Sequence, residues 1–437
     1  MPDGWFAAQW SRFGQTLDDI LNRYSRQPNG PDMFERRIPE WLRHAPAPSV
    51  RGFALLGGFE AMARGILVSV FPVAVYNSLQ EASLVSRAYF LIGVVSLFAG
   101  LLVPWLNRFI PRRYLYAFGV LLFMFGAGFG ATGISAFVIA GLFMTTLATV
   151  ITFVCFNAYV LDYIAKIELG RCETLRLFYS ALGWTIGPAA GISLYALWKP
   201  APFIISAVAT AMLFGAFLYM RLGNGKLIVR AKRPAPNPLA FLGRFVQQPR
   251  LVTGWIFAVI RSCGWWVYVV YLPIFAIENG LPEQLGGLLL SLTNAGLLAA
   301  PLMLRFVQRY SVRRAVRTGF LLSGFAFLFA AGLADWALAS VACLCIGSFF
   351  LILLDVCAGL PFLMAVKPSE RTEMSAIYSS YRDVSGILTP GVAWVTLMVA
   401  PLSTVFAVSG AGLLACFALA SRLHPRLGQG RVRAEPT

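Results

Sequence analysis

The feature that most constrains this chain is a series of long apolar stretches that starts near residue 51 and continues almost to the end. A helix needs about 20 mostly apolar residues to cross the hydrocarbon of a bilayer. Only 13% of the residues are charged, against about 25% in soluble proteins. The sequence therefore predicts an all-α polytopic membrane protein. Its twelve predicted transmembrane helices are 52–76, 83–106, 114–133, 136–162, 174–197, 201–221, 251–276, 284–306, 315–333, 337–362, 374–398 and 402–421.

The net charge of +17 comes largely from short basic runs between these stretches. Alternate joints are rich in arginine, as at Arg112 and Arg113, whereas the others carry little more than Arg87 and Lys199. Basic joints mark the cytoplasmic side of a membrane protein, so we expect both termini to be cytoplasmic and the chain to lie in the cell inner membrane. This distribution indicates anionic membrane lipids, and not nucleic acid, as the partner of the charge.

The longest joint is basic, contains Pro234, Pro236 and Pro238, and divides the spans six plus six. Apolar residues at helical spacing between Phe6 and Tyr24 predict an amphipathic helix lying in the membrane surface, or alternatively a docking helix for a partner. The predicted segments are a cytoplasmic N-terminal segment at 1–50, six-helix bundles at 51–221 and 251–421, a cytoplasmic linker at 222–250 and a cytoplasmic tail at 422–437.

The two halves resemble each other at an offset near 201 residues. The matches are Asn107–Arg113 with Gln308–Arg314, Arg171 with Arg371, Tyr179 with Tyr381, Pro188 with Pro390, and Phe71-Pro72 with Leu272-Pro273. Repeated halves place a pseudo-symmetric interface near the middle of the membrane, where secondary transporters hold their substrates.

The joint after the second span resembles the Gly-x-x-x-Asp-Arg-x-Gly-Arg-Arg signature of the major facilitator superfamily. Gly100, Arg108, Arg112 and Arg113 stand for its glycine and basic residues, and Asn107 stands where the family has an aspartate. The resemblance covers residues 51–421. It implies two pseudo-symmetric six-helix bundles, and it implies that Arg108, Arg112 and Arg113 belong to a cytoplasmic latch.

The fifth span contains Gly183, Gly187, Pro188 and Gly191, which resemble the Gly-x-x-x-Gly-Pro-x-x-Gly element common in antiporters of that family. Glycines at this spacing let helices approach closely, and the proline removes a backbone hydrogen bond and kinks the helix. The resemblance implies export by antiport, with Pro188 as a gating residue. The alternative is a bent, tightly packed helix without that role.

Ionisable side chains are few inside the predicted spans, where each costs about 2.5–3.5 kcal/mol on insertion scales. Glu60 and Arg64 lie four residues apart on one face of the first span, and Arg261 lies in the seventh span near the repeat position of Glu60. Two arginines and one glutamate leave one positive charge without a counter-charge, which suits binding of a carboxylate or phosphate. We predict that these three bind substrate, with Glu60 also in proton coupling; the alternative is an ion pair without a role in transport.

Four further charges lie in or beside the spans. Asp355, near the middle of the tenth span, has no charged counterpart in the other half, and a lone buried carboxylate can take up and release a proton. It is the predicted proton-coupling residue. Asp162 is predicted to latch onto Arg108 or Arg112. Arg382 and Asp383 are adjacent and cannot face each other, so we assign Arg382 to the substrate site and Asp383 to the latch, with the reverse left open.

Trp265, one turn beyond Arg261, joins Tyr179 and Tyr381 in the predicted substrate site. No phosphate loop, nucleotide fingerprint or nucleophile arrangement is present, so we expect no cofactor, no metal site and no enzymatic activity. Together these features predict a monomeric, proton-coupled secondary transporter of a small molecule that works by alternating access, as an exporter or as a carrier of an organic anion. The alternative is a transporter-like membrane scaffold that serves as an assembly factor or receptor.

Overall fold

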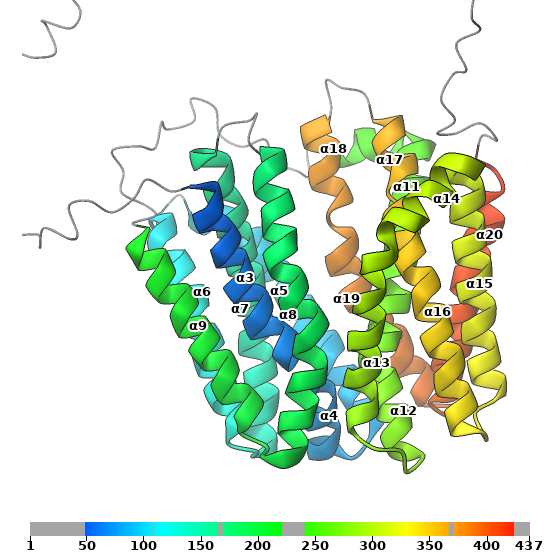
Figure 1. The fold of residues 1–437 in the computed structure, drawn as a ribbon, viewed down its shortest axis with the longest axis horizontal. Helices are drawn as coiled ribbons and strands as arrows, with labels where there is room; N and C mark the ends of the chain where they lie inside the picture. The colour runs from blue at the N-terminus through cyan, green and yellow to red at the C-terminus, as the bar shows by residue number, and fades with distance from the viewer. Residues whose placement is uncertain (1–48, 108, 165–168, 221–240, 367–370, 424–437) are drawn as a thin grey trace, which may run out of the picture. The chain divides into compact units, whose positions relative to one another are not determined.

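The computed structural model describes residues 49–107, 109–164, 169–220, 241–366 and 371–423, and helices follow the predicted apolar stretches throughout these ranges (Figure 1). The predicted surface helix near the N-terminus and most of the predicted linker lie outside the described residues. The first half contains α3 (Val50–Leu67), α4 (Val70–Leu79), α5 (Ala82–Leu106), α6 (Arg112–Ala131), α7 (Ser135–Tyr163), α8 (Leu169–Leu197) and α9 (Ala201–Tyr219).

The second half is more interrupted. It contains α10 (Leu242–Val246), α11 (Pro249–Trp266), the π-helical η2 (Val267–Tyr271), α12 (Leu272–Glu278), α13 (Gln284–Ala295), the 3₁₀ segment η3 (Gly296–Ala299), α14 (Ala300–Tyr310), α15 (Val312–Gly332), α16 (Ala337–Cys357), α17 (Leu360–Ala365), α18 (Arg371–Tyr378), α19 (Tyr381–Leu397) and α20 (Ser403–Ala420).

Nine helical segments of the described chain are long and apolar enough to cross a membrane, when α3–α4, α11–α12 and α16–α17 are each taken as one. The other three predicted spans correspond to α8, α13–α14 and α18–α19. The first of these carries Arg171 and Arg176 near its start, and the other two are broken by a 3₁₀ or turn segment. The prediction of a helical protein with several membrane-spanning helices is confirmed. Each of the twelve predicted spans corresponds to helical segments, but within the residues that the structure describes only nine of them meet the criterion of length and apolar character.

The same packing pattern occurs in both halves. In the first half α3 packs against α8 and α9, and α6 packs against α7 and α9. In the second half α11 packs against α19 and α20, and α15 packs against α16 and α20. Two helix pairs form the most extensive contacts between the halves, α5 with α19 and α8 with α13. We call these two pairs the seams. The repeat relates α5 to α13 and α8 to α19, so each seam is the counterpart of the other, as expected for two pseudo-symmetric bundles. The predicted segment boundaries themselves stay predictions.

The first and seventh spans are interrupted at related positions. The first changes from α3 to α4 at Val68–Ser69, and the seventh passes through the π-helical turn η2. At the first break, the Ser69 hydroxyl donates a hydrogen bond of 2.7 Å to the carbonyl of Pro188 on α8. π-Helical turns and broken helices are frequent where a membrane helix borders a functional site. The breaks bring irregular backbone to the middle of each bundle.

A proline in α8 also explains one of the seams. Because Pro188 has no N–H, the carbonyl of Trp184 one turn earlier loses its helical partner. The side-chain amide of Asn294 on α13 donates to that carbonyl at 2.7 Å, and the Ser291 hydroxyl accepts from the N–H of Ala189 at 2.8 Å. Side chains of the second half therefore form hydrogen bonds with the backbone groups beside the proline of the first half.

This arrangement predicts a coupled effect of Asn294 and Pro188 on stability. Asn294→Leu leaves the Trp184 carbonyl without a partner, and we expect it to cost about 1–3 kcal/mol, measured as a lower midpoint of thermal unfolding in detergent. In a Pro188→Ala background the helix supplies its own N–H, so the same substitution is expected to cost less. An equal loss in both backgrounds would contradict this account of the seam.

Candidate functional site

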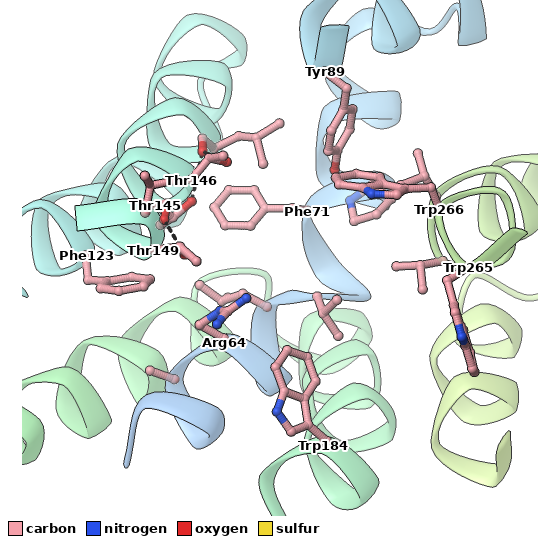
Figure 2. A pocket seen from close by; sticks show the side chains of 18 of the residues that line it. Arg64, Phe71, Tyr89, Phe123, Thr145, Thr146, Thr149, Trp184, Trp265 and Trp266 are labelled. Atoms are coloured by element: carbon pink, nitrogen blue, oxygen red, sulfur yellow. Dashed lines mark hydrogen bonds between the residues drawn. The ribbon is translucent and has the colours of Figure 1, made fainter. Parts of the chain in front are cut away.

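A cavity of about 390 Å³ lies between the halves, and we call it the central cavity. Helices α3–α8 of the first half and α11 and η2 of the second half line it. Arg64 is its charged lining residue in the described part of the chain. Figure 2 shows the aromatic rings that surround the same space: Phe71, Tyr89, Phe123, Trp184, Trp265 and Trp266. The cavity is thus apolar and aromatic, with one guanidinium.

Glu60 and Arg64 form an ion pair within α3, with 3.2 Å between Glu60 Oε1 and an Arg64 guanidinium nitrogen. The Arg64 side chain is 33% exposed and that of Glu60 only 14%. The guanidinium also lies 5.4 Å from the ring centre of Trp184, within the range of a cation–π interaction. The pair therefore presents its positive member to the cavity and keeps its negative member more buried.

Arg261 does not join that pair. Its Nε lies 3.0 Å from Oδ1 of Asp355 on α16, and its guanidinium carbon lies 5.3 Å from the ring centre of Tyr381. The indole N–H of Trp265 donates to the other carboxylate oxygen at 3.0 Å. Asp355 is therefore not the lone carboxylate that the sequence indicated. The repeat relates Asp355 only to a position in the other half, and the partner of Asp355 lies on a different helix of the same half.

A second space of about 240 Å³, which we call the side cavity, adjoins the central cavity. Asp355 and Asn294 line it. Val68, Trp184, Trp265 and Val269 line both spaces. Trp265 therefore contacts the central cavity with its ring and Asp355 with its N–H, which links the two spaces through one side chain.

The threonines of α7 are not among the predicted site residues. Thr145, Thr146 and Thr149 line the central cavity, and Figure 2 shows them on the same side as Arg64. Their spacing of three and four residues places them on one helix face, a polar stripe in an otherwise apolar span. That stripe was a usable signal. It was overlooked because uncharged hydroxyls cost little in a membrane helix and so do not stand out.

The other predicted site residues lie outside the two cavities. Tyr179 packs beside Gly58 and next to Phe178, and Arg382 lies between the rings of Phe153 and Tyr381. Arg382 also donates to the Tyr381 hydroxyl at 3.2 Å. The assignment of Tyr179, Tyr381 and Arg382 to the substrate site stays a prediction.

The predicted latch is described only in part. Arg112 lies over the ring of Tyr159 and Arg113 over that of Tyr114, at 5.3 and 4.8 Å from guanidinium carbon to ring centre. Asp383 lies exposed on the first turn of α19. Arg108 and the side chain of Asp162 are outside the described residues, so their predicted ion pair is not tested.

Three side-chain hydrogen bonds join the halves at the end opposite the arginine-rich joints, which we call the opposite end. The Tyr76 hydroxyl donates to Glu278 at 3.2 Å, and the Asn77 amide donates to Glu283 at 3.3 Å. Deeper in, the Tyr271 hydroxyl donates to Ser86 at 2.9 Å. These bonds connect α4 and α5 of the first half with η2, with the end of α12 and with the joint after α12. At this end the halves are held together.

Comparison with known proteins agrees with this geometry. A sequence profile described as the Major Facilitator Superfamily matches residues 53–390. The chain belongs to the major facilitator superfamily. No curated protein sequence matches it.

Solved structures share the fold at low sequence identity. The nucleoside transporter NupG is 13% identical, with a TM-score of 0.64 over 86% of this chain and 99% of NupG. A POT family transporter in complex with 5-aminolevulinic acid is 12% identical, with a TM-score of 0.66 over 89% and 99%. A bacterial homologue of the iron transporter ferroportin is 16% identical, with a TM-score of 0.65 over 86% and 99%. At these identities the likeness shows the fold alone.

The two ion pairs of this superfamily member predict unequal losses of stability. Asp355→Ala leaves Arg261, only 8% exposed, without its counter-ion. We expect a loss below the about 3–5 kcal/mol typical of a fully buried pair, because Asp355 itself is 34% exposed. Glu60→Ala is the matched control and should cost less, since Arg64 remains hydrated in the cavity.

Thermal unfolding in detergent measures both effects. A double variant, Arg261→Met with Asp355→Leu, removes both charges and should recover much of the loss. A larger loss of stability in Glu60→Ala than in Asp355→Ala would contradict this account, in which the more buried arginine makes its ion pair the more important one.

Proposed function

We propose that this protein is a proton-coupled secondary transporter that carries a small organic anion by alternating access. The observation that supports it is the central cavity itself, which lies between two repeated bundles and displays the guanidinium of Arg64. A cavity of a few hundred Å³ with one well-placed charge is typical of a small-molecule site. Membership of the superfamily supports the assignment as a secondary transporter, and the guanidinium in the cavity supports an organic anion as the substrate.

Alternating access requires the two ends to close in turn, and the hydrogen bonds at the opposite end favour a state closed there. Tyr76, Asn77 and Tyr271 would then have to release Glu278, Glu283 and Ser86 when the halves rock. These are neutral donors paired with carboxylates or a hydroxyl, and such bonds contribute about 0.5–3 kcal/mol each in net terms. That range suits contacts that form and break in every cycle.

Asp355 is the proposed proton-binding residue. One of its oxygens is held by Arg261 and the other by Trp265, and it lines the side cavity, which offers a path for a proton. Protonation cancels the charge that attracts Arg261 and that strengthens the hydrogen bond from Trp265, so it would loosen Trp265, a wall of the central cavity. Proton binding in one space is thereby linked to the shape of the other.

We further propose that the protein is a monomer in the cell inner membrane, with the arginine-rich joints and both termini in the cytoplasm beside anionic lipids. On this orientation the opposite end, where hydrogen bonds join the halves, faces outward. The likeness of the α8 glycine–proline element to that of antiporters favours export. Flux in vesicles of known orientation would decide the direction.

Reconstitution in proteoliposomes tests the proposal. Radiolabelled organic anions, amphiphiles and sugars are screened for saturable flux with and without a pH gradient. We expect flux of at least one anion to be accelerated by the gradient. Asp355→Asn should reduce that flux to the rate seen without a gradient, because the neutral amide cannot take up the proton.

Asp335→Asn is the matched control, since Asp335 is an exposed carboxylate in the joint after α15, away from both cavities. It should leave the gradient effect unchanged. Wild-type coupling in Asp355→Asn would remove Asp355 from the mechanism. Absence of flux for every solute, together with loss of cellular function on deletion of residues 1–48 alone, would favour the scaffold alternative.

A further inference from the structure

The threonines of the central cavity have a restricted hydrogen-bonding capacity. Each hydroxyl donates its proton to a backbone carbonyl of α7: Thr145 to Gly141 at 2.9 Å, Thr146 to Leu142 at 2.7 Å and Thr149 to Thr145 at 2.8 Å. A hydroxyl has one proton and two acceptor lone pairs. What these three side chains offer to the cavity is therefore acceptor capacity only.

The wall nearest these threonines has the complementary character. Arg64 has five N–H donors and no acceptor, and only its contact with Glu60 is a hydrogen bond in the described structure. Because the guanidinium is more exposed than its partner carboxylate, the potential that it presents to the cavity is positive. A cationic ligand is disfavoured here, and a carboxylate is favoured by the fork of the guanidinium.

The remaining wall is flat and apolar. Trp184, Trp265, Trp266 and Phe71 enclose the space beside Arg64 and the threonines, as Figure 2 shows. Indole and phenyl faces pack well against another aromatic ring. At about 390 Å³ the cavity is at the small end of ligand sites, which suits one ring and a short chain.

We infer that the central cavity binds a small aromatic carboxylic acid that carries an O–H or N–H donor of its own. The carboxylate pairs with Arg64, the ring lies among the tryptophans, and the donor is accepted by Thr146 or Thr149. This inference rests on the proposed transport function and narrows its substrate class. An acid without a donor leaves the threonine lone pairs desolvated and unmatched, which is the basis of the selectivity.

Three acids of nearly equal shape test the donor. They are 3-phenylpropionate, 3-(4-hydroxyphenyl)propionate and the methyl ether 3-(4-methoxyphenyl)propionate, titrated into the full-length protein in detergent by isothermal calorimetry. We expect the hydroxy acid to bind about 3- to 10-fold more tightly than either of the others, the effect of one hydrogen bond. The methyl ether keeps the oxygen and removes only the donor.

Substitutions on α7 locate the acceptor. Thr146→Val or Thr149→Val, or the two together, should abolish the advantage of the hydroxy acid, and Ser at the same position should retain it. Thr152→Val is the matched control, because Thr152 bonds to the same helix backbone, is 1% exposed and does not line the cavity. It should leave the ratio of affinities unchanged. Arg64→Gln should weaken all three acids, but not the neutral amide of the hydroxy acid.

The outcomes separate this inference from the proposed function. The inference is overturned if no acid binds up to its solubility limit, if the three bind equally, or if the advantage survives both valine substitutions in protein that keeps its helical content. Gradient-driven flux of a solute outside this class would overturn the inference and leave transport standing. Selective binding of the hydroxy acid without flux would support the inference and contradict transport.

Discussion

The structure depends on the requirement that every backbone polar group in a bilayer find a partner within the protein. Helices satisfy it automatically, and each departure from a helix must be repaired. Pro188 frees the carbonyl of Trp184, and Asn294 of the other half takes it up. The break between α3 and α4 is bordered by Ser69, whose hydroxyl bonds to the carbonyl of Pro188. Both hydrogen bonds join α8 to a neighbouring segment, and Trp184, whose carbonyl accepts one of them, lines the central cavity.

The same requirement explains why the cavity can be selective without many charges. A threonine in a membrane helix satisfies its own proton by bonding back to the preceding turn, which costs the helix little. The remaining lone pairs are then the only polar groups that it presents to a ligand. On α7 this occurs three times on one face, on the same side of the cavity as the Arg64 guanidinium. A binding surface with separate donor and acceptor walls arises from ordinary helix chemistry.

The fold could be predicted from the sequence because hydropathy and the internal repeat are properties of many residues at once, so that an error at a single position has little effect. The sequence indicated Arg64 and Trp265 as cavity residues for the same reason that it indicated Asp355: charged or large aromatic groups are costly or prominent in lipid. It did not reach the pairing of Arg261 with Asp355, which depends on how α11 meets α16. It also missed Thr146 and Thr149, whose role depends on where their protons go.

The repeat makes the two seams comparable, and they differ at one position. Pro188 and Pro390 are related by the repeat, and each frees the carbonyl one turn before it, Trp184 in α8 and Gly386 in α19. Asn294 bonds to the first, whereas at the second the residue equivalent to Asn294 is Gly93, where a Cβ would lie 2.9 Å from the Gly386 oxygen. One seam therefore contains a polar side chain beside a cavity and the other a close backbone contact. The side cavity with Asp355 borders the first seam through Trp184 and Asn294. In the described structure the related prolines are therefore accommodated differently, by a close backbone contact at one seam and by a polar side chain beside the proposed proton site at the other.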